Sequence, residues 1–177
     1  MAGVLSNKIQ KDELKPGDHI YSWRHSFTYA HHGIYVGNGN VIHFTQGPGQ
    51  GIGTGTGLDR FISSSSPSNP CEPPCPICGD RSKSDGVISS CLDCFLDGGE
   101  LYLFQYGVSS VFLAQARGGT CTDALSDSPE DVVHRAEYFL QNGFGVYNIL
   151  KKNCEDFAID CKTGSTVFTS NSVGRSG

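Results

Sequence analysis

The stretch YAHHGIYVGNGNVIHF, residues 29–44, decides the fold of this chain. Two runs of aromatic and β-branched residues flank the pair Asn38-Gly39, which is a strong β-hairpin signal because both residues tolerate a positive φ. His31 and His43 are therefore expected on adjacent strands. A strict two-residue turn would place their imidazoles on opposite faces of the sheet, whereas an odd-length loop or a bulge would place them on one face. We predict the second arrangement, which brings the two histidines together.

The segment NCEDF, residues 153–157, predicts a cysteine at the start of a helix. Asn153 is a favoured N-cap, and Asp156 three residues later fits a capping box. Cys154 then lies in the first turn of a helix expected over residues 154–162, where free backbone N–H groups and the helix dipole favour a thiolate. The neighbouring acidic charges oppose the thiolate, so a basic partner is still required. The alternative is a buried structural cysteine.

Local patterns predict the neighbouring elements. Strands are expected near 18–23, 29–37 and 40–45, and further strands over 101–106 and 111–116 around a turn at Gly107. Ser128 followed by Pro129 and two acidic residues is a typical helix start.

Four cysteines form two Cys-x-x-Cys pairs that are separated by twelve residues: Cys75, Cys78, Cys91 and Cys94. This spacing is close to that of known four-cysteine zinc sites, so we expect a structural Zn²⁺ in a small knuckle inserted at residues 70–96. Two disulfides, or cysteines without a ligand, are the alternatives. Cys71 is a further candidate ligand.

Composition favours one domain, residues 13–164, followed by a flexible tail at 165–177. The net charge of −5 and the lack of a basic block argue against nucleic acid as a partner. The N-terminus lacks the apolar core of a signal peptide, and no run approaches the ~20 apolar residues of a membrane span. We therefore expect a cytoplasmic protein whose membrane contact, if any, is peripheral.

Three motifs in this order, HHGIYVG from His31, VIHF around His43 and NCEDF around Cys154, resemble the lecithin:retinol acyltransferase (LRAT)-like family. The resemblance covers about residues 13–60 and 96–164, and it extends to plant proteins known only as "NC domain-containing". It implies an α+β fold of the circularly permuted, papain-like NlpC type, with an antiparallel sheet packed on helices. The zinc knuckle is absent from the animal acyltransferases of this family.

The same resemblance implies the roles of the site residues. His31 takes the position of the general base, His43 that of the residue that orients it, and Cys154 that of the nucleophile. His32 falls where the family varies and receives no catalytic role. Tyr29 lies two residues before His31, hence on the same strand face, and is a candidate to help the Cys154 backbone N–H hold an oxyanion.

The predicted function is thiol-dependent acyl transfer or acyl hydrolysis through a Cys154 thioester. The family suggests a lipid ester as the acyl donor, while the residues themselves specify only thioester chemistry and fit other acyl esters as well. Two alternatives stay open: a cysteine amidase or peptidase, and a non-catalytic interaction protein that docks through its zinc knuckle.

Overall fold

The structure is a computed structural model that describes residues 7–24, 29–45, 75–78, 86–116, 119–145 and 153–164. Its centre is a six-stranded sheet in the order β1-β6-β2-β3-β4-β5, with every neighbouring pair antiparallel. The strands are β1 (Asn7–Lys8), β2 (His19–Arg24), β3 (Tyr29–Gly37), β4 (Asn40–Thr45), β5 (Gly86–Cys91) and β6 (Tyr102–Leu103). The helices are η1 (Lys11–Glu13), α2 (Leu92–Leu96), α3 (Ser110–Gln115), α4 (Pro129–Asn142) and α5 (Cys154–Thr163). The predicted α+β class, an antiparallel sheet packed on helices, is confirmed.

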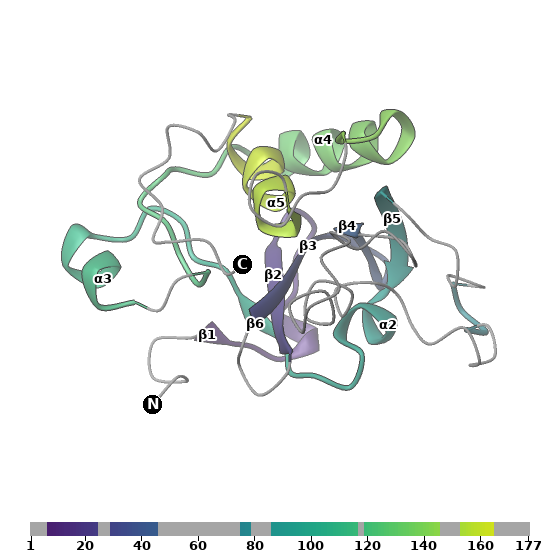
Figure 1. Ribbon diagram of the computed structural model, residues 1–177, viewed down its shortest axis with the longest axis horizontal. Coiled ribbons are helices and arrows are strands. Elements are labelled where there is room, and N and C mark those ends of the chain that lie inside the picture. The colour runs from purple at the N-terminus through teal and green to yellow at the C-terminus, as the bar shows by residue number, and fades with distance from the viewer. Residues whose placement is uncertain are drawn as a thin grey trace, which may run out of the picture.

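Helices cover both faces of this sheet. Figure 1 shows α4 and α5 together over one face, and α2 beside β5. On the first face, Ile34, Ile42 and Phe44 pack against residues of α4 and α5, including Phe157. On the other face, Ile20 and Val41 pack against Leu92, Phe95 and Leu96 of α2. Neighbouring strand residues point to opposite faces, so each strand supplies both cores.

The β3–β4 hairpin contains the bulge that the sequence predicted. Ile34 pairs with Ile42 and Tyr35 with Val41, but the register then shifts, and Gly37 pairs with Asn40. The one extra residue on β3 at this bulge shifts the pairing of the two strands by one position. Residues 31 and 43 therefore lie on the same face of the sheet. The prediction that His31 and His43 share a face is confirmed.

The predicted helix starts are also confirmed. In α4, the Ser128 side chain accepts a hydrogen bond from the Asp131 N–H, and Pro129 occupies the first turn. In α5, Asn153 and Asp156 form the expected capping box, and Gly164 ends the helix in the left-handed region. These signals lie within a few residues of each other, and tertiary contacts did not override them.

The strand predicted over residues 111–116 is wrong. This segment forms helix α3, because the Ser109 side chain accepts a hydrogen bond from the Phe112 N–H and caps a short helix. The strand predicted over 101–106 is shorter than expected: only β6 forms, and Gln105 makes an isolated bridge to Cys121. A run of consecutive apolar residues does not by itself distinguish a strand from a helix.

Part of the predicted knuckle belongs to the main sheet. Residues 86–96 form β5, which pairs with β4 along its whole length, and α2, which packs against the core.

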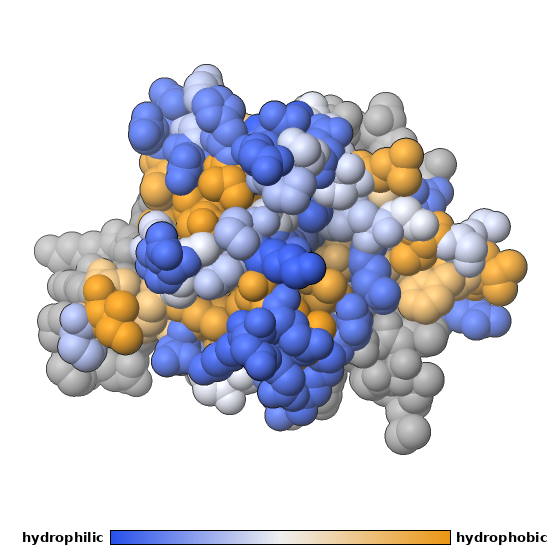
Figure 2. Space-filling model, turned by 180° about the vertical axis from the view of Figure 1, so that it is seen from behind, coloured by the Kyte–Doolittle hydropathy of each residue, from blue (hydrophilic) through white to orange (hydrophobic). Residues whose placement is uncertain are grey.

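Within the described residues, no helix has the length and apolar character needed to cross a membrane. Figure 2 shows hydrophobic side chains in several separate groups between hydrophilic ones on the face seen there.

Candidate active site

The two predicted catalytic histidines form a buried hydrogen-bonded pair. Nε2 of His31 and Nδ1 of His43 are 2.9 Å apart, and the rings meet edge to face at 89°. Nε2 of His43 in turn lies 3.0 Å from Oγ of Ser90, which comes from β5. The Phe95 ring packs against both imidazoles with centroid distances of 5.2 Å. The site therefore contains a hydrogen-bonded chain of His31, His43 and Ser90, with the Phe95 ring packed against its two imidazoles.

The remaining nitrogen of His31 is available for chemistry. Nδ1 is buried and has no hydrogen-bond partner among the residues that the structure describes. Burial, together with the nearby His43 and Arg24, holds the pKa of His31 well below its ordinary value of 6.5. His31 is consequently neutral near pH 7, and a neutral imidazole that donates through Nε2 keeps an open acceptor at Nδ1.

Cys154 begins helix α5, where the sequence placed it. The Asp156 N–H donates to Oδ1 of Asn153 at 3.1 Å, and the Asn153 N–H donates to Oδ2 of Asp156 at 3.2 Å. The Cys154 side chain is buried, and its Sγ lies 3.9 Å from the carbonyl oxygen of Ala30. Because Ala30 immediately precedes His31 on β3, the thiol lies beside the strand that carries the proposed base.

A half-buried cation near this site was missed by the sequence reasoning. Arg24 ends β2, pairs with Tyr29 across the β2–β3 register, and donates from Nη2 to the Phe95 carbonyl at 2.5 Å. Burial lowers the pKa of Arg24, whereas the negative charges that Asp97, Tyr29 and Cys154 carry when ionised raise it. Arg24 is thus close enough to Cys154 for its positive charge to attract a Cys154 thiolate. The signal available in the sequence was an arginine that ends an otherwise uncharged, buried strand.

A second polar cluster lies on the opposite face of the sheet. Nε2 of His19 and Nδ1 of His32 are 2.8 Å apart, and Nδ1 of His19 lies 2.8 Å from the Tyr106 hydroxyl. Nε2 of His32 lies 3.7 Å from Oε2 of Glu155, and both side chains are fully buried. The Lys162 ammonium sits 5.1 Å from the centre of the Tyr106 ring. This cluster could not be seen in the sequence because its members come from separate elements.

Burial lowers the pKa of His32 to about 3, so His32 is neutral near pH 7 and its contact with Glu155 does not involve an imidazolium. His32 follows His31 on β3 and therefore points away from the catalytic pair. Glu155 follows Cys154 on α5, so the cluster instead fixes the helix turn that carries the thiol.

The four predicted metal-binding cysteines come together. The Sγ atoms of Cys75, Cys78, Cys91 and Cys94 all lie within 4.8 Å of one another, and none of the four residues forms a disulfide. Backbone N–H groups of Cys78 and Ile77 lower the pKa of Cys75 to about 6, as is typical of a knuckle that supports thiolates. Four converging sulfur ligands fit a tetrahedral ion such as Zn²⁺ and leave no open coordination position. Cys71 lies outside the described residues.

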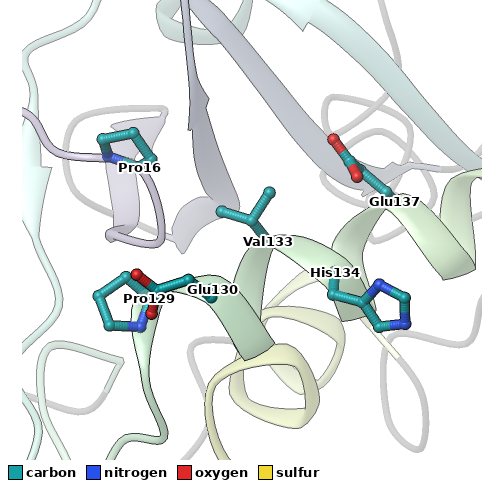
Figure 3. A pocket seen from close by; sticks show the side chains of 6 residues that line it. All are labelled: Pro16, Pro129, Glu130, Val133, His134 and Glu137. Carbon is teal, nitrogen blue, oxygen red and sulfur yellow. The ribbon is translucent and has the colours of Figure 1, made fainter.

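A pocket of about 310 Å³ lies elsewhere, between Pro16 and the outer side of α4. Figure 3 shows its lining, which includes Val133, His134 and two acidic side chains, Glu130 and Glu137. None of the predicted catalytic residues lines this pocket, so it supplies no nucleophile to the site described above.

The described site combines a buried histidine pair on the sheet with a cysteine at the start of a helix. A model of the family described as "Lecithin retinol acyltransferase" matches residues 12–167, and the chain belongs to this family. The chain is also similar to "Protein LEAD-SENSITIVE 1" of Arabidopsis thaliana, with 57% identity over 176 residues that cover 99% of this chain and 67% of the relative. The family resemblance inferred from the motifs is confirmed. Membership supports acyltransferase-type chemistry in general, and the name of the relative states no reaction.

Proposed function

We propose that this protein is a thiol-dependent acyltransferase or acyl hydrolase that works through an acyl thioester on Cys154. The observation that carries the proposal is the buried Nδ1 of His31, which has no hydrogen-bond partner within the described part of the chain. His43 lies within hydrogen-bond distance of the other nitrogen of the same ring, and Nδ1 is an open acceptor when Nε2 of His31 donates to His43. Nucleophile, base and orienting group are the three parts that such a reaction requires.

In the first half-reaction, the proton of the Cys154 thiol passes to Nδ1 of His31 and the sulfur attacks the carbonyl carbon of an acyl ester. The imidazolium and the thiolate stabilise each other by their opposite charges, which offsets the low pKa of the free imidazole. The ester C–O bond breaks, and the departing alkoxide takes the proton from His31 to leave as an alcohol. An acyl group is then joined to Cys154 through a thioester.

In the second half-reaction, His31 removes a proton from water, an alcohol or an amine, and that nucleophile attacks the thioester. The C–S bond breaks, and Cys154 recovers its proton from His31. The backbone N–H of Cys154 at the start of α5 is suited to hold the oxyanion in both steps, and we assign Tyr29 as its helper. The positive charge of the half-buried Arg24 favours the same anionic states.

We propose a lipid or other acyl ester as the donor, reached through peripheral contact with a membrane or lipid aggregate. We also propose that the four-cysteine cluster binds Zn²⁺ as a structural ion, since four thiolates would leave no position for substrate.

The test is the capture of the thioester. The purified chain is mixed with an activated acyl ester, quenched in acid and measured by intact-mass spectrometry followed by peptide mapping. One acyl group on Cys154 is expected in the wild type, none in Cys154→Ala, and much slower acylation in His31→Gln. Cys161→Ala is the matched control, because this buried cysteine on the same helix should not matter.

The alternatives predict other outcomes. Preferential acylation by amide donors over esters would indicate an amidase or peptidase. A wild-type protein that forms no thioester with any acyl donor would contradict the enzymatic proposal and favour an interaction protein.

A further inference from the structure

The four-cysteine cluster and the catalytic histidines share the same two elements. Cys91 is the last residue of β5, and Cys94 lies in α2, which begins at the next residue after β5. Ser90 immediately precedes Cys91, and Phe95 immediately follows Cys94. Both of these neighbours contact imidazoles of the site: Ser90 contacts His43, and Phe95 contacts His31 and His43. Each is one peptide bond away from a candidate metal ligand.

The direction of the hydrogen-bond chain depends on whether Ser90 accepts from His43 or donates to it. If its Oγ accepts from Nε2–H of His43, Nδ1 of His43 accepts from Nε2–H of His31, and Nδ1 of His31 is left as an open acceptor. If Ser90 instead donates to His43, both tautomers reverse and Nδ1 of His31 carries a proton. Only the first direction gives a base for Cys154, because the second leaves no lone pair at that nitrogen.

Phe95 and Ser90 are both buried and closely packed. Ser90 is buried, and it pairs with Val41 in the β4–β5 ladder. A Cβ atom added to Gly33 would come within 2.8 Å of the Phe95 ring and 3.1 Å of Cβ of His43, so ring, strand and imidazole are in close contact. A small shift of Phe95 would therefore move the histidines.

The elements that carry these two residues are short. Helix α2 has five residues, and residues 86–89 of β5 are only partly buried or exposed. A helix of this length has little stability of its own. A metal ion bound by thiolates from both elements would supply the missing constraint, since metal-binding free energy becomes folding free energy.

We propose that Ser90 and Phe95 are positioning residues for the catalytic pair, and that the metal bound at the four cysteines keeps them in place. The cluster is then part of the catalytic support, and occupancy of the metal site sets the reactivity of Cys154. This inference rests on the proposed function, because it requires Cys154 to be the nucleophile.

The first experiment uses the zinc-loaded chain and three variants: Ser90→Ala, Ser90→Thr and Ser89→Ala. Single-turnover acylation of Cys154 is measured against probe concentration, alongside metal content, melting temperature and the ¹⁵N shifts of the imidazole nitrogens. Ser90→Ala should keep its metal and its apparent affinity for the probe, while the maximal acylation rate falls about tenfold, the effect of one lost buried hydrogen bond. Ser90→Thr should restore the rate. Ser89→Ala, at the exposed neighbouring position, should match the wild type.

The second experiment removes the metal. A Cys75→Ser, Cys78→Ser double variant should lose zinc, remain folded by circular dichroism and show the same change in imidazole ¹⁵N shifts as Ser90→Ala, together with slower acylation. Wild-type rates in both Ser90→Ala and the folded, metal-free variant would overturn the inference. Global unfolding on metal loss would overturn it too, because the ion would then support the whole sheet and not this site. A zinc-loaded wild type that forms no thioester would instead refute the proposed function.

Discussion

Acid should destabilise this protein through its buried histidines. His19, His31 and His32 are fully or almost fully buried, and burial lowers the pKa of each below the ordinary value of 6.5, for His32 to about 3. In the unfolded chain all three bind protons below about pH 6.5, whereas in the folded chain they stay neutral until the pH falls much further. The unfolded state therefore binds more protons in this window, and the free energy of unfolding falls as the pH falls.

The size of the effect follows from proton linkage. When the pH falls from about 7 to about 5.5, each histidine that stays neutral in the folded state lowers the free energy of unfolding by about 1.2 kcal/mol. Three such histidines lower it by about 4 kcal/mol. Near pH 5.5, each also adds about 1.2 kcal/mol per pH unit to the slope of the unfolding free energy. That loss is a large share of the free energy of unfolding of a typical domain, which is roughly 5–15 kcal/mol.

The assay is urea unfolding at a series of pH values, with wild type, His32→Asn and His134→Ala measured in the same zinc-containing buffer. Asparagine can keep the hydrogen bond toward His19, so His32→Asn should reduce the slope by one histidine's share. His134→Ala is the control for the loss of an exposed histidine. Proton uptake at the cysteine cluster is common to all three proteins and cancels in the comparison. Equal slopes in wild type and His32→Asn would refute the reasoning, because His32 would then be an imidazolium paired with Glu155 in the folded protein.

Two further predictions concern thiol reactivity and packing. Near neutral pH, iodoacetamide should alkylate Cys154 ahead of Cys121 and Cys161, since burial raises the pKa of both of the latter; peptide mapping measures this, and equal labelling of the three would contradict it. Gly33→Ala should lower the free energy of unfolding by about 1–3 kcal/mol, because the new methyl group would meet the Phe95 ring at 2.8 Å. A melting temperature equal to that of the wild type would show that the ring moves aside at no cost.

Signals of short range were enough to predict much of this fold. The Asn38-Gly39 turn, the Ser128-Pro129 helix start and the capping box at Asn153 each depend on residues a few positions apart, and all three form as expected. Segments without such a signal were less predictable. Residues 111–116 are apolar except for Gln115, and they form a helix instead of the predicted strand because the Ser109 side chain accepts a hydrogen bond from the first turn.

The sequence by itself determined the identities of the nucleophile candidate and the two histidines, because hairpin periodicity and helix capping are written in neighbouring residues. Tertiary structure alone decided what surrounds them. Ser90 meets His43 only because β5 pairs with β4 across some forty residues of chain, and Glu155 meets His32 only because α5 packs on β3. Arg24 likewise reaches the neighbourhood of Cys154 only in the folded molecule. Contacts of this kind arise from sheet order and helix docking, which depend on the packing of the whole core and leave no local periodic signal in the chain.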